Sequence, residues 1–366
     1  MSLKAGIVGL PNVGKSTLFN AITKKNILAA NYPFATIEPN VGVVLVPDTR
    51  LDFLREMYNP KSCVPTSFEF IDIAGLVEGA SSGEGLGNKF LSHIRNVDAI
   101  VQVVRCFDDK NIIHVSGNTD PLRDIDVINI ELVLSDLEIV TNRIGKIEKK
   151  AIATKDKDAL EELRILKMCK ESLELSNPLR LLDLTVEEKE IIKNFNFITL
   201  KPMIYAANVS EDDIVVGDNE YTLKVKEFAG KENSGVIVMC AKIEAELAGL
   251  EDNEKSEFLE SLGITNSGLD KLIFATYDLL GLATFFTSGV DEVKAWTFKK
   301  GMKAPACGGI IHSDIERGFI RAEVTKFMDL ETLGSEKNVQ SAGKLNIEGK
   351  EYELQDGDIC YFRFNV

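Results

Sequence analysis

Residues Gly9-Leu-Pro-Asn-Val-Gly-Lys-Ser16 have the pattern GxxxxGKS, and the residues on either side of them decide the fold. The apolar run Ala5-Gly-Ile-Val8 predicts a strand before the pattern, and Ser16-Thr-Leu-Phe-Asn-Ala-Ile22 predicts a helix after it. A loop between strand and helix turns its backbone N–H groups toward a polyphosphate, Lys15 adds a positive charge, and the Ser16 hydroxyl can ligate Mg²⁺. The alternative is a glycine-rich turn before an ordinary helix. The order of strand, loop and helix favours a nucleoside triphosphate site, whose phosphates we expect to contact Asn12, Val13, Gly14, Lys15, Ser16 and Thr17.

The composition is that of a globular protein and limits the other functions. The chain has 366 residues, 45% of them hydrophobic and 27% charged, which is enough for two or three domains. There is no apolar run long enough to span a membrane, and Met-Ser-Leu-Lys leads directly into the first strand, so we expect no signal peptide. Six cysteines without a CxxC pair suggest reduced thiols and a cytoplasmic location. The net charge of −15 disfavours non-specific duplex binding, so no DNA partner is expected.

Two loops after the first helix resemble the switches of a GTPase-type domain. Thr36 lies in a segment with two prolines, where it can reach the γ-phosphate side of Mg²⁺. The strand Ser67-Phe-Glu-Phe-Ile71 leads into Asp72-Ile-Ala-Gly75, a DxxG sequence. In such a sequence the Asp lies on the magnesium side, in some sites through a water, and the Gly contacts the γ-phosphate. We therefore expect Ser16, Thr36 and Asp72 to serve Mg²⁺, and Thr36 and Gly75 to sense the γ-phosphate.

The residue after this glycine is unusual. GTPases of the Ras type carry there a Gln that orients the attacking water, whereas this chain has Leu76, which has no donor or acceptor. Hydrolysis must use another group or be slow. His114 follows the predicted strand Ala99–Val104, and a neutral imidazole could orient or deprotonate water. Spacing alone leaves open whether His114 has this role or is a structural loop residue.

The sequence that reads the base is altered as well. The predicted strand Met203–Ala207 ends at Asn208-Val-Ser-Glu211, where a guanine-specific site has Asn-Lys-x-Asp. Val209 lacks a charged stem and Glu211 is one methylene longer than Asp, so the two hydrogen bonds to guanine are not guaranteed and adenine becomes plausible. Cys240-Ala-Lys242 follows the predicted strand Gly235–Met239 and takes the place of the Ser-Ala-Lys loop behind the base. The expected base-binding residues are Asn208, Val209, Glu211, Cys240 and Ala241.

Together, these motifs and the segment Pro33-Phe-Ala-Thr-Ile-Glu-Pro-Asn40 resemble the YchF/Obg-like ATPase family over the whole chain, in its bacterial form. The resemblance implies a P-loop protein of the translation-factor class that prefers ATP or accepts GTP too, and whose slow hydrolysis is stimulated on ribosomes. It implies that a hydrophobic residue replaces the catalytic Gln, as Leu76 does, and that a histidine at the position of His114 takes over its role. Asn12 matches the Asn of related GTPases that use K⁺ in place of an arginine finger, which would make K⁺ a second cation.

A long insertion separates the His114 loop from the Asn208 strand. Spacings of three and four separate Ile130, Val133, Leu137, Val140, Ile144, Ile147 and Ala151. A second apolar series follows a polar break and consists of Leu160, Leu163, Leu166 and Leu173. This pattern predicts an antiparallel helical hairpin with a coiled-coil seam, about 30 Å long. Two core-packed helices without a projecting arm are the alternative. The tip collects basic residues that predict an RNA or ribosome contact, or else simply a solvated end: Arg143, Lys146, Lys149, Lys150, Lys155 and Lys157.

From Gly281 onward the sequence changes to short β runs and turns. Strands are predicted at Lys294–Phe298, Gly318–Val324, Tyr352–Leu354 and Ile359–Phe364, with a short helix over Ala306–Ser313 and a turn at Asp356-Gly-Asp358. This pattern indicates a β-grasp module and resembles a TGS domain. Lys299, Lys300 and Lys303 beside Trp296 and Phe298 form a second candidate RNA patch, unless this is merely a half-buried strand with an exposed rim.

The predicted fold class is α/β, a three-layer GTPase-type P-loop domain with an inserted helical hairpin and a C-terminal β-grasp domain. The expected domains are a nucleotide domain over 1–280, interrupted by the insertion 128–200, and a TGS-like domain over 281–366. The leading hypothesis is a monomeric ATPase that binds the ribosome through the hairpin and the TGS-like domain and acts as a switch. The alternative is a binding protein for which ATP is an allosteric ligand and hydrolysis is incidental. A conventional GTPase with an unusual base motif is the third reading.

Overall fold

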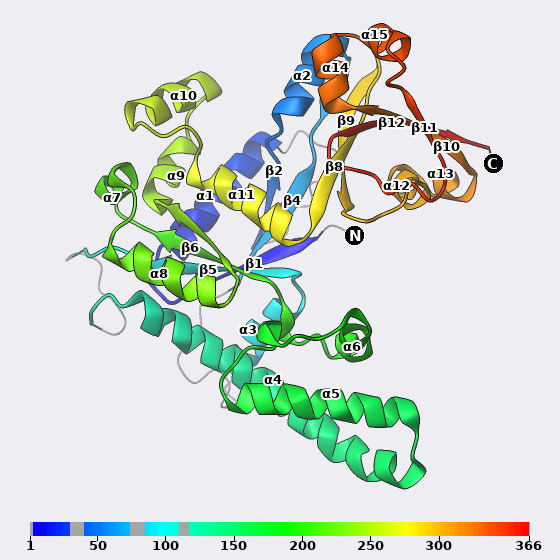
Figure 1. The fold of residues 1–366 in the computed structure, drawn as a ribbon. Helices are drawn as coiled ribbons and strands as arrows, with labels where there is room; N and C mark the ends of the chain where they lie inside the picture. The colour runs from blue at the N-terminus through cyan, green and yellow to red at the C-terminus, as the bar shows by residue number, and fades with distance from the viewer. Residues whose placement is uncertain (1–2, 30–39, 74–84, 110–116, 366) are drawn as a thin grey trace. The chain divides into compact units, whose positions relative to one another are not determined.

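The computed structural model describes residues 3–29, 40–73, 85–109 and 117–365. They form two compact units. The first comprises residues 1–44 and 69–276, and the second comprises residues 45–68 and 277–366. The segment 45–68, which the sequence places in the nucleotide domain, therefore packs with the C-terminal residues. Figure 1 shows the elements of both units.

The first unit is built on a six-stranded sheet in the order β2-β4-β1-β5-β6-β7. Each pair from β4 to β7 along this order is parallel. The strands β5 and β6 are buried along their whole length, as expected for parallel strands covered on both faces. The strands of this sheet are β1 Lys4–Val8, β2 Val41–Leu45, β4 Ser67–Asp72, β5 Ala99–Arg105, β6 Met203–Asn208 and β7 Gly235–Met239. The five strands predicted in this region are confirmed, and β2 is an addition.

Helices of ordinary length lie between these strands or follow β7, the last of them. They are α1 Lys15–Ala29, α3 Gly85–Arg95, α7 Glu211–Val216, α8 Glu220–Lys231, α9 Ala241–Leu247, α10 Asp252–Ser261 and α11 Gly268–Leu279. The helix predicted at Ser16 is α1. The order of strands and helices is that of a P-loop domain, which confirms the predicted fold class for this unit.

The insertion forms the predicted helical hairpin. α4 (Pro121–Thr154) begins at Asp120, whose side chain accepts a hydrogen bond from the Arg123 N–H. It ends where Lys155 takes a left-handed conformation (φ 54°), and α5 (Lys157–Glu174) starts after the Asp156 cap. α5 has 18 residues, about 27 Å at 1.5 Å per residue. The two helices pack on each other and run beyond the sheet in Figure 1. Short helices follow them: η2 Leu179–Leu181, α6 Val186–Ile192, η3 Lys193–Phe195 and η4 Ile198–Leu200.

The predicted coiled-coil seam is only partly present. Val133 and Val140 are buried with Leu166 and Leu173 of α5 in a core that also includes residues of η2, α6 and η4. Ile130 and Leu160 were predicted in the seam, but they are 48% and 37% exposed. The first half of α4 instead packs on the sheet and α8, with Ile125, Ile128 and Leu132 buried. A straight α-helix has 3.6 residues per turn, so a stripe with a heptad repeat drifts slowly around its surface. One such stripe therefore cannot face both the sheet and α5.

The second unit has a six-stranded sheet in the order β11-β10-β12-β8-β9-β3. The β8–β9 and β10–β12 pairs are antiparallel, and β12 runs parallel to β8 between them. This is the β-grasp arrangement that the sequence predicted. The strands are β3 Ser62–Val64, β8 Leu282–Thr287, β9 Glu292–Lys299, β10 Phe319–Lys326, β11 Asn346–Glu348 and β12 Asp358–Phe364. The predicted strand Tyr352–Leu354 is wrong, because only an isolated bridge joins Glu353 to Lys303.

Helices cover both faces of this sheet. One core lies under α12 (Ala304–Ile311) and α13 (Ser313–Arg317), with Phe285 and Phe362 among its buried residues. α12 corresponds to the predicted helix Ala306–Ser313, but α12 begins two residues earlier than predicted. The other core joins α2 (Thr49–Tyr58), α14 (Phe327–Leu333) and α15 (Glu336–Ser341) to the opposite face.

Candidate nucleotide-binding site

The loop between β1 and α1 has the geometry needed to surround an anion. Asn12 and Gly14 have positive φ angles of 64° and 98°, which fold the chain back before α1 begins at Lys15. The Leu18 N–H donates to the Gly14 carbonyl at 2.9 Å, so the first helical turn starts at the loop itself. The earlier N–H groups of a helix have no partner within the helix and carry its positive dipole end. A cleft of about 480 Å³ opens on this segment and is lined by Leu10, Pro11, Asn12, Gly14, Lys15, Ser16 and Thr17.

Lys15 and Asp72 meet at this cleft. The strand register places Ile7 beside Asp72, and the Lys15 ammonium contacts the Asp72 carboxylate. Lys15 is largely buried, whereas Ser16 and Thr17 are exposed at the start of α1. Of the predicted magnesium residues, Ser16 lines the cleft, and Asp72 contacts Lys15, the neighbour of Ser16 in the chain. Thr36, the third, lies outside the described residues.

These residues fit a magnesium ion held jointly with phosphate. Mg²⁺ keeps several waters and binds through one or two protein oxygens plus phosphate oxygens, so it needs no cage of side chains. In the part of the chain that the structure describes, no group of three or more His, Cys, Asp or Glu could hold a metal by itself. The Ser16 hydroxyl and the Asp72 carboxylate supply oxygen donors beside the phosphate loop.

Asn208 connects the phosphate loop to the base side of the site. Its side-chain N–H donates to the Val13 carbonyl at 2.8 Å, and its side-chain oxygen accepts from the Ala241 N–H at 2.9 Å. Asn208 ends β6, where it lies beside Met239 of β7. The approach is close: a Cβ on Gly14 would lie 2.2 Å from the Asn208 Nδ2. One buried amide therefore fixes the phosphate loop, the end of β6 and the start of α9 relative to one another.

A second cleft, of about 530 Å³, continues from the phosphate loop past Asn208. Residues of the loops after β5, β6 and β7 line it together with α1. In open α/β sheets, ligands bind at this carboxyl edge of the strands. The lining residues are Asn12, Gly14, Thr17, Phe107, Asp108, Asp109, Asn208, Val209, Ser210, Glu211, Cys240, Ala241 and Lys242.

All five predicted base residues line this cleft. Val209 is buried, and its N–H donates to the Met239 carbonyl at 2.9 Å, so it supports the cleft wall rather than covering a base with a long stem. Burial raises the pKa of the Cys240 thiol, which keeps this side chain neutral. Glu211 is exposed and is paired with Lys242 across the cleft, Oε2 to Nζ at 2.5 Å.

The loop after β5 is a part of the site that the sequence did not reveal. Arg105 is buried, donates to the Phe107 carbonyl at 3.0 Å and lies 4.7 Å from the centre of the Phe107 ring. Asp108 accepts a hydrogen bond from the Tyr221 hydroxyl at 2.8 Å. These contacts hold the Phe107–Asp109 wall of the cleft. The position of these residues directly after a buried parallel strand was the signal that could have found them.

Three other predicted residues, Gly75, Leu76 and His114, lie outside the described residues, as does Thr36. Their predicted roles stay predictions.

Two family models match the chain. One, described as 50S ribosome-binding GTPase, matches residues 4–156. The other is named for the YchF GTPase C-terminal domain, carries the description "protein of unknown function", and matches residues 282–365.

Similar proteins cover the chain from end to end. A Bacillus subtilis protein named ribosome-binding ATPase YchF is 60% identical over 367 residues, with 100% of both chains covered. An Escherichia coli O157:H7 protein of the same name is 53% identical, also with 100% of both chains covered. The solved structure of the Schizosaccharomyces pombe YchF GTPase is 42% identical, with a TM-score of 0.90, and the match covers 99% of this chain and 98% of that one.

The chain belongs to the YchF family. The resemblance noted in the sequence is thereby confirmed, and the comparisons confirm the combination of a P-loop domain with a C-terminal YchF domain. In the described part of this YchF chain, no helix has the length and apolar character of a membrane span.

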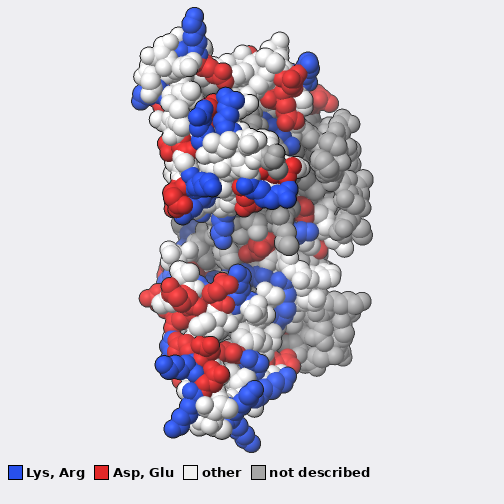
Figure 2. All heavy atoms as spheres, turned by 90° about the vertical axis from the view of Figure 1, so that its right-hand side faces the viewer, with Lys and Arg blue, Asp and Glu red and all other residues white. Residues whose placement is uncertain are grey.

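The basic surfaces predicted from this YchF sequence differ in character. At the hairpin tip, Arg143 is paired with Glu162 (2.6 and 3.0 Å), but the lysines there are exposed. Figure 2 shows Lys and Arg side chains at the lower end of the molecule, where the hairpin ends, with acidic side chains beside them. In the second patch Phe298 is buried, Lys300 donates to Asp278 at 2.6 Å, and Lys303 is paired with Glu351. That patch offers no stacking surface at Phe298.

Proposed function

We propose that this protein is a magnesium-dependent ATPase that acts as a nucleotide-controlled switch on the ribosome. The observation that carries the proposal is the joint at Asn208, which couples a complete phosphate loop to a base cleft that has Val209 and Glu211 where a guanine site has Lys and Asp. Support comes from relatives of the same length that are named ribosome-binding ATPase YchF.

Each group of site residues has a separate role in this proposal. The N–H groups of Asn12 to Thr17 and the Lys15 ammonium bind the phosphates. They stabilise the negative charge of the transferred phosphoryl group in the transition state. Ser16, Thr36 and Asp72 hold Mg²⁺, with Asp72 acting directly or through a water. Thr36 and Gly75 respond to the γ-phosphate. The cleft lined by Asn208, Val209, Glu211, Cys240 and Ala241 receives the base, with ATP preferred and GTP accepted more weakly.

Hydrolysis is slow in this proposal because Leu76 cannot orient water. His114 takes that role, with a neutral imidazole positioning the attacking water. The side-chain oxygen of Asn12, together with phosphate oxygens, holds a K⁺ ion that offsets charge at the phosphates. The protein acts as a monomer. Its hairpin tip, with exposed Lys146, Lys149 and Lys150, contacts ribosomal RNA, as does the TGS-like C-terminal unit.

Leu76 also keeps the second candidate open, a nucleotide-gated binding protein in which hydrolysis is incidental. Titration calorimetry with ATP and GTP, in Mg²⁺ with K⁺ and then with Na⁺, tests the nucleotide site. We expect tighter binding of ATP, a loss of at least tenfold in affinity for Lys15→Ala, and a difference between K⁺ and Na⁺. A strong preference for GTP would contradict the proposed base cleft.

Single-turnover hydrolysis with and without ribosomes separates the two candidates. For the switch we expect stimulation by ribosomes and a loss of about 10²-fold or more in His114→Ala. Equal rates with and without ribosomes, together with full activity of His114→Ala, would leave the nucleotide-gated binding protein as the better account.

A further inference from the structure

Asn219, at the start of α8, makes three side-chain hydrogen bonds next to the base cleft. Its oxygen accepts from the Thr222 N–H at 2.9 Å, which caps the helix. Its amide nitrogen donates to the Cys106 carbonyl at 2.8 Å and to the Asp213 carboxylate at 3.1 Å. The cap explains only the first of these bonds. The other two reach residues of two different loops.

These two loops form opposite parts of the cleft lining. β5 and β6 are paired as far as Arg105 and Asn208, and beyond this pair the residues Phe107–Asp109 and Val209–Glu211 line the cleft. Cys106 comes directly before the first of these segments. Asp213 holds the second, because its carboxylate accepts from the hydroxyl of Ser210 at 2.7 Å. Asn219 therefore joins the two segments just outside the sheet.

The chemistry of the amide group explains why this cap is an asparagine. Ser, Thr and Asp cap helices equally well through an oxygen that accepts from the backbone. An ionised Asp has no donor, however, and a hydroxyl has only one. Neither can cap α8 and also donate to both the Cys106 carbonyl and the Asp213 carboxylate. An asparagine has one acceptor and two donors, and all three are used here.

The first turn of α8 holds the segment after β5 at a second point. The Tyr221 hydroxyl donates to Asp108 at 2.8 Å, two residues beyond Cys106. The turn itself is well anchored, because Thr222 and Val225 are fully buried and α8 packs on β6 and β7. It is thus a fixed base from which the cleft lining can be held.

We propose that Asn219 is a positioning residue of the nucleotide site: through Cys106 and Asp213 it holds the two sides of the base cleft at the separation that a base requires. This inference rests on the proposed function. Asn219 does not line the cleft itself and acts through residues that do. The phosphates are bound by other residues, so the loss of Asn219 should weaken ATP binding without slowing the reaction of bound ATP.

Asn219→Asp tests this role, because a carboxylate still accepts from the Thr222 N–H but cannot donate to Cys106 or Asp213. In titration calorimetry of the full chain with Mg²⁺, we expect an ATP affinity about tenfold lower, since a buried carbonyl loses its partner and two carboxylates face each other. KM for hydrolysis should rise by a similar factor, with kcat unchanged. Asn219→Ser, an uncharged cap that cannot donate to both partners, should shift KM in the same direction.

Two further variants make the outcome specific. Thr185→Ala removes the cap of α6, where the hydroxyl accepts from the Glu188 N–H at 3.2 Å, and it should leave the ATP affinity unchanged. In the double variant Asn219→Asp with Asp213→Asn, residue 213 can donate to residue 219, which removes the repulsion but leaves the Cys106 carbonyl without its donor. We expect its ATP affinity to remain about fivefold below that of the unmodified chain. Melting curves of each variant show whether it is folded.

An unchanged ATP affinity in folded Asn219→Asp and Asn219→Ser would overturn the inference, as would a fall in kcat at constant KM. An equal loss in Thr185→Ala would mean that any lost helix cap has this effect. Full recovery in the double variant would show that the bond to Cys106 is not needed. If the unmodified chain did not bind ATP, the proposed function itself would fail, and the same titrations show this separately.

Discussion

At the scale of single residues, buried polar side chains hold the functional parts of this protein in place. Asn208 satisfies one donor and one acceptor from two different loops. Asp136 of α4 holds the segment that leads into β6 in place. It is fully buried and accepts hydrogen bonds from the Ile198 N–H (3.1 Å), the Thr199 N–H (2.7 Å) and the Thr199 hydroxyl (2.7 Å). Since β6 ends in Asn208, Asp136 supports the base cleft from the opposite end of the strand.

Replacing Asp136 tests this support. In Asp136→Asn, the amide group can accept hydrogen bonds at only one atom. Some of the three donors, the Ile198 N–H, the Thr199 N–H and the Thr199 hydroxyl, therefore lose their acceptor. We expect the free energy of unfolding to fall by about 2–3 kcal/mol, the cost of buried donors left without partners. Urea denaturation followed by far-ultraviolet circular dichroism, which reports on the helices, measures the change.

The same variant gives a pH dependence. Burial raises the pKa of the Asp136 carboxyl in the folded protein, although its hydrogen bonds act in the opposite direction. The stability linked to this raised pKa is fully present below the unfolded value, about 3.9, and is lost as pH rises through the folded value. The gap between the unmodified chain and Asp136→Asn should therefore narrow as pH rises from about 4. A gap that widens over this range would contradict the assignment.

At the scale of elements, α4 shows why a correct helix prediction can still misplace side chains. The apolar spacing correctly predicted two helices, because periodicity is a local property. It could not show that Ile130 would face outward, because the first half of α4 packs on the sheet and the second half packs on α5. Phe107 was missed for a related reason. Its place in the cleft wall depends on loops that are far apart in sequence and meet only at the sheet edge.

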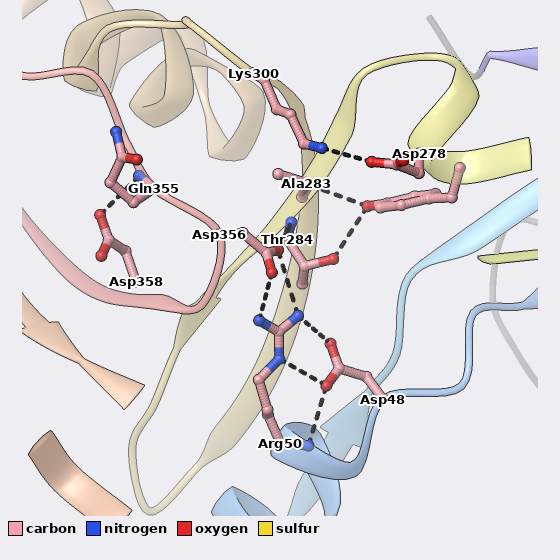
Figure 3. A network of polar contacts seen from close by, with 10 residues as sticks. Asp48, Arg50, Asp278, Ala283, Thr284, Lys300, Gln355, Asp356 and Asp358 are labelled. Carbon is pink, nitrogen blue, oxygen red and sulfur yellow. Dashed lines mark hydrogen bonds and ion pairs between the residues drawn. The ribbon is translucent and has the colours of Figure 1, made fainter. Parts of the chain in front are cut away.

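Besides its apolar contacts, the helix α2 is held to the rest of the second unit by one arginine. Figure 3 shows Arg50 between Asp48 and Asp356. It donates to both Asp48 oxygens (2.9 and 2.8 Å) and to Asp356 (2.7 Å). Asp356 in turn accepts from the Thr284 N–H of β8 at 2.8 Å. The guanidinium also lies 5.3 Å from the centre of the Phe286 ring. The network joins the cap of α2, the turn before β12 and the middle of the sheet.

We expect Arg50→Ala to lower the free energy of unfolding of the second unit by about 2 kcal/mol, because it leaves the largely buried Asp48 carboxylate and the half-exposed Asp356 carboxylate without their cation. Trp296 is the only tryptophan of the chain and lies in β9, so its fluorescence during urea denaturation reports on this unit. Lys61→Ala is the matched control. Its ion pair with Asp291 (2.7 Å) is about 80% exposed on both sides, and its loss should cost less than about 0.5 kcal/mol. Equal effects of the two substitutions would show that the Arg50 network adds nothing beyond a surface pair.

At the scale of the whole molecule, neither unit is one continuous stretch of the chain. The first unit is interrupted by residues 45–68, which belong to the second. The sequence could not predict this, because β3 is three residues long and its pairing with β9 spans more than half of the chain. The P-loop strand and helix, by contrast, were predicted because their signals lie within adjacent residues. Local patterns fixed the elements, and long-range pairing decided to which unit they belong.

This interleaving makes a prediction for fragments. Residues 277–366 contain the β-grasp strands but lack Leu51 and Leu54 of α2, which are buried against Phe286, Val293 and Ile359. They also lack β3, which pairs with the edge of β9. Without these parts the fragment exposes an apolar face and an open strand edge, both of which favour aggregation. We expect 277–366 alone to lack a cooperative unfolding transition.

The matched control is the same fragment with residues 45–68 joined to its N-terminus by a flexible Gly/Ser linker. It restores Leu51, Leu54, Arg50 and β3, and we expect it to unfold cooperatively, with the Trp296 fluorescence of the full chain. Urea denaturation of both fragments, with sedimentation to detect aggregates, compares them directly. If 277–366 alone unfolded as cooperatively as the joined fragment, residues 45–68 would not be required for the second unit to fold. If only the joined fragment folds, a chain segment that lies between Thr36 and Asp72 in sequence is part of the C-terminal fold.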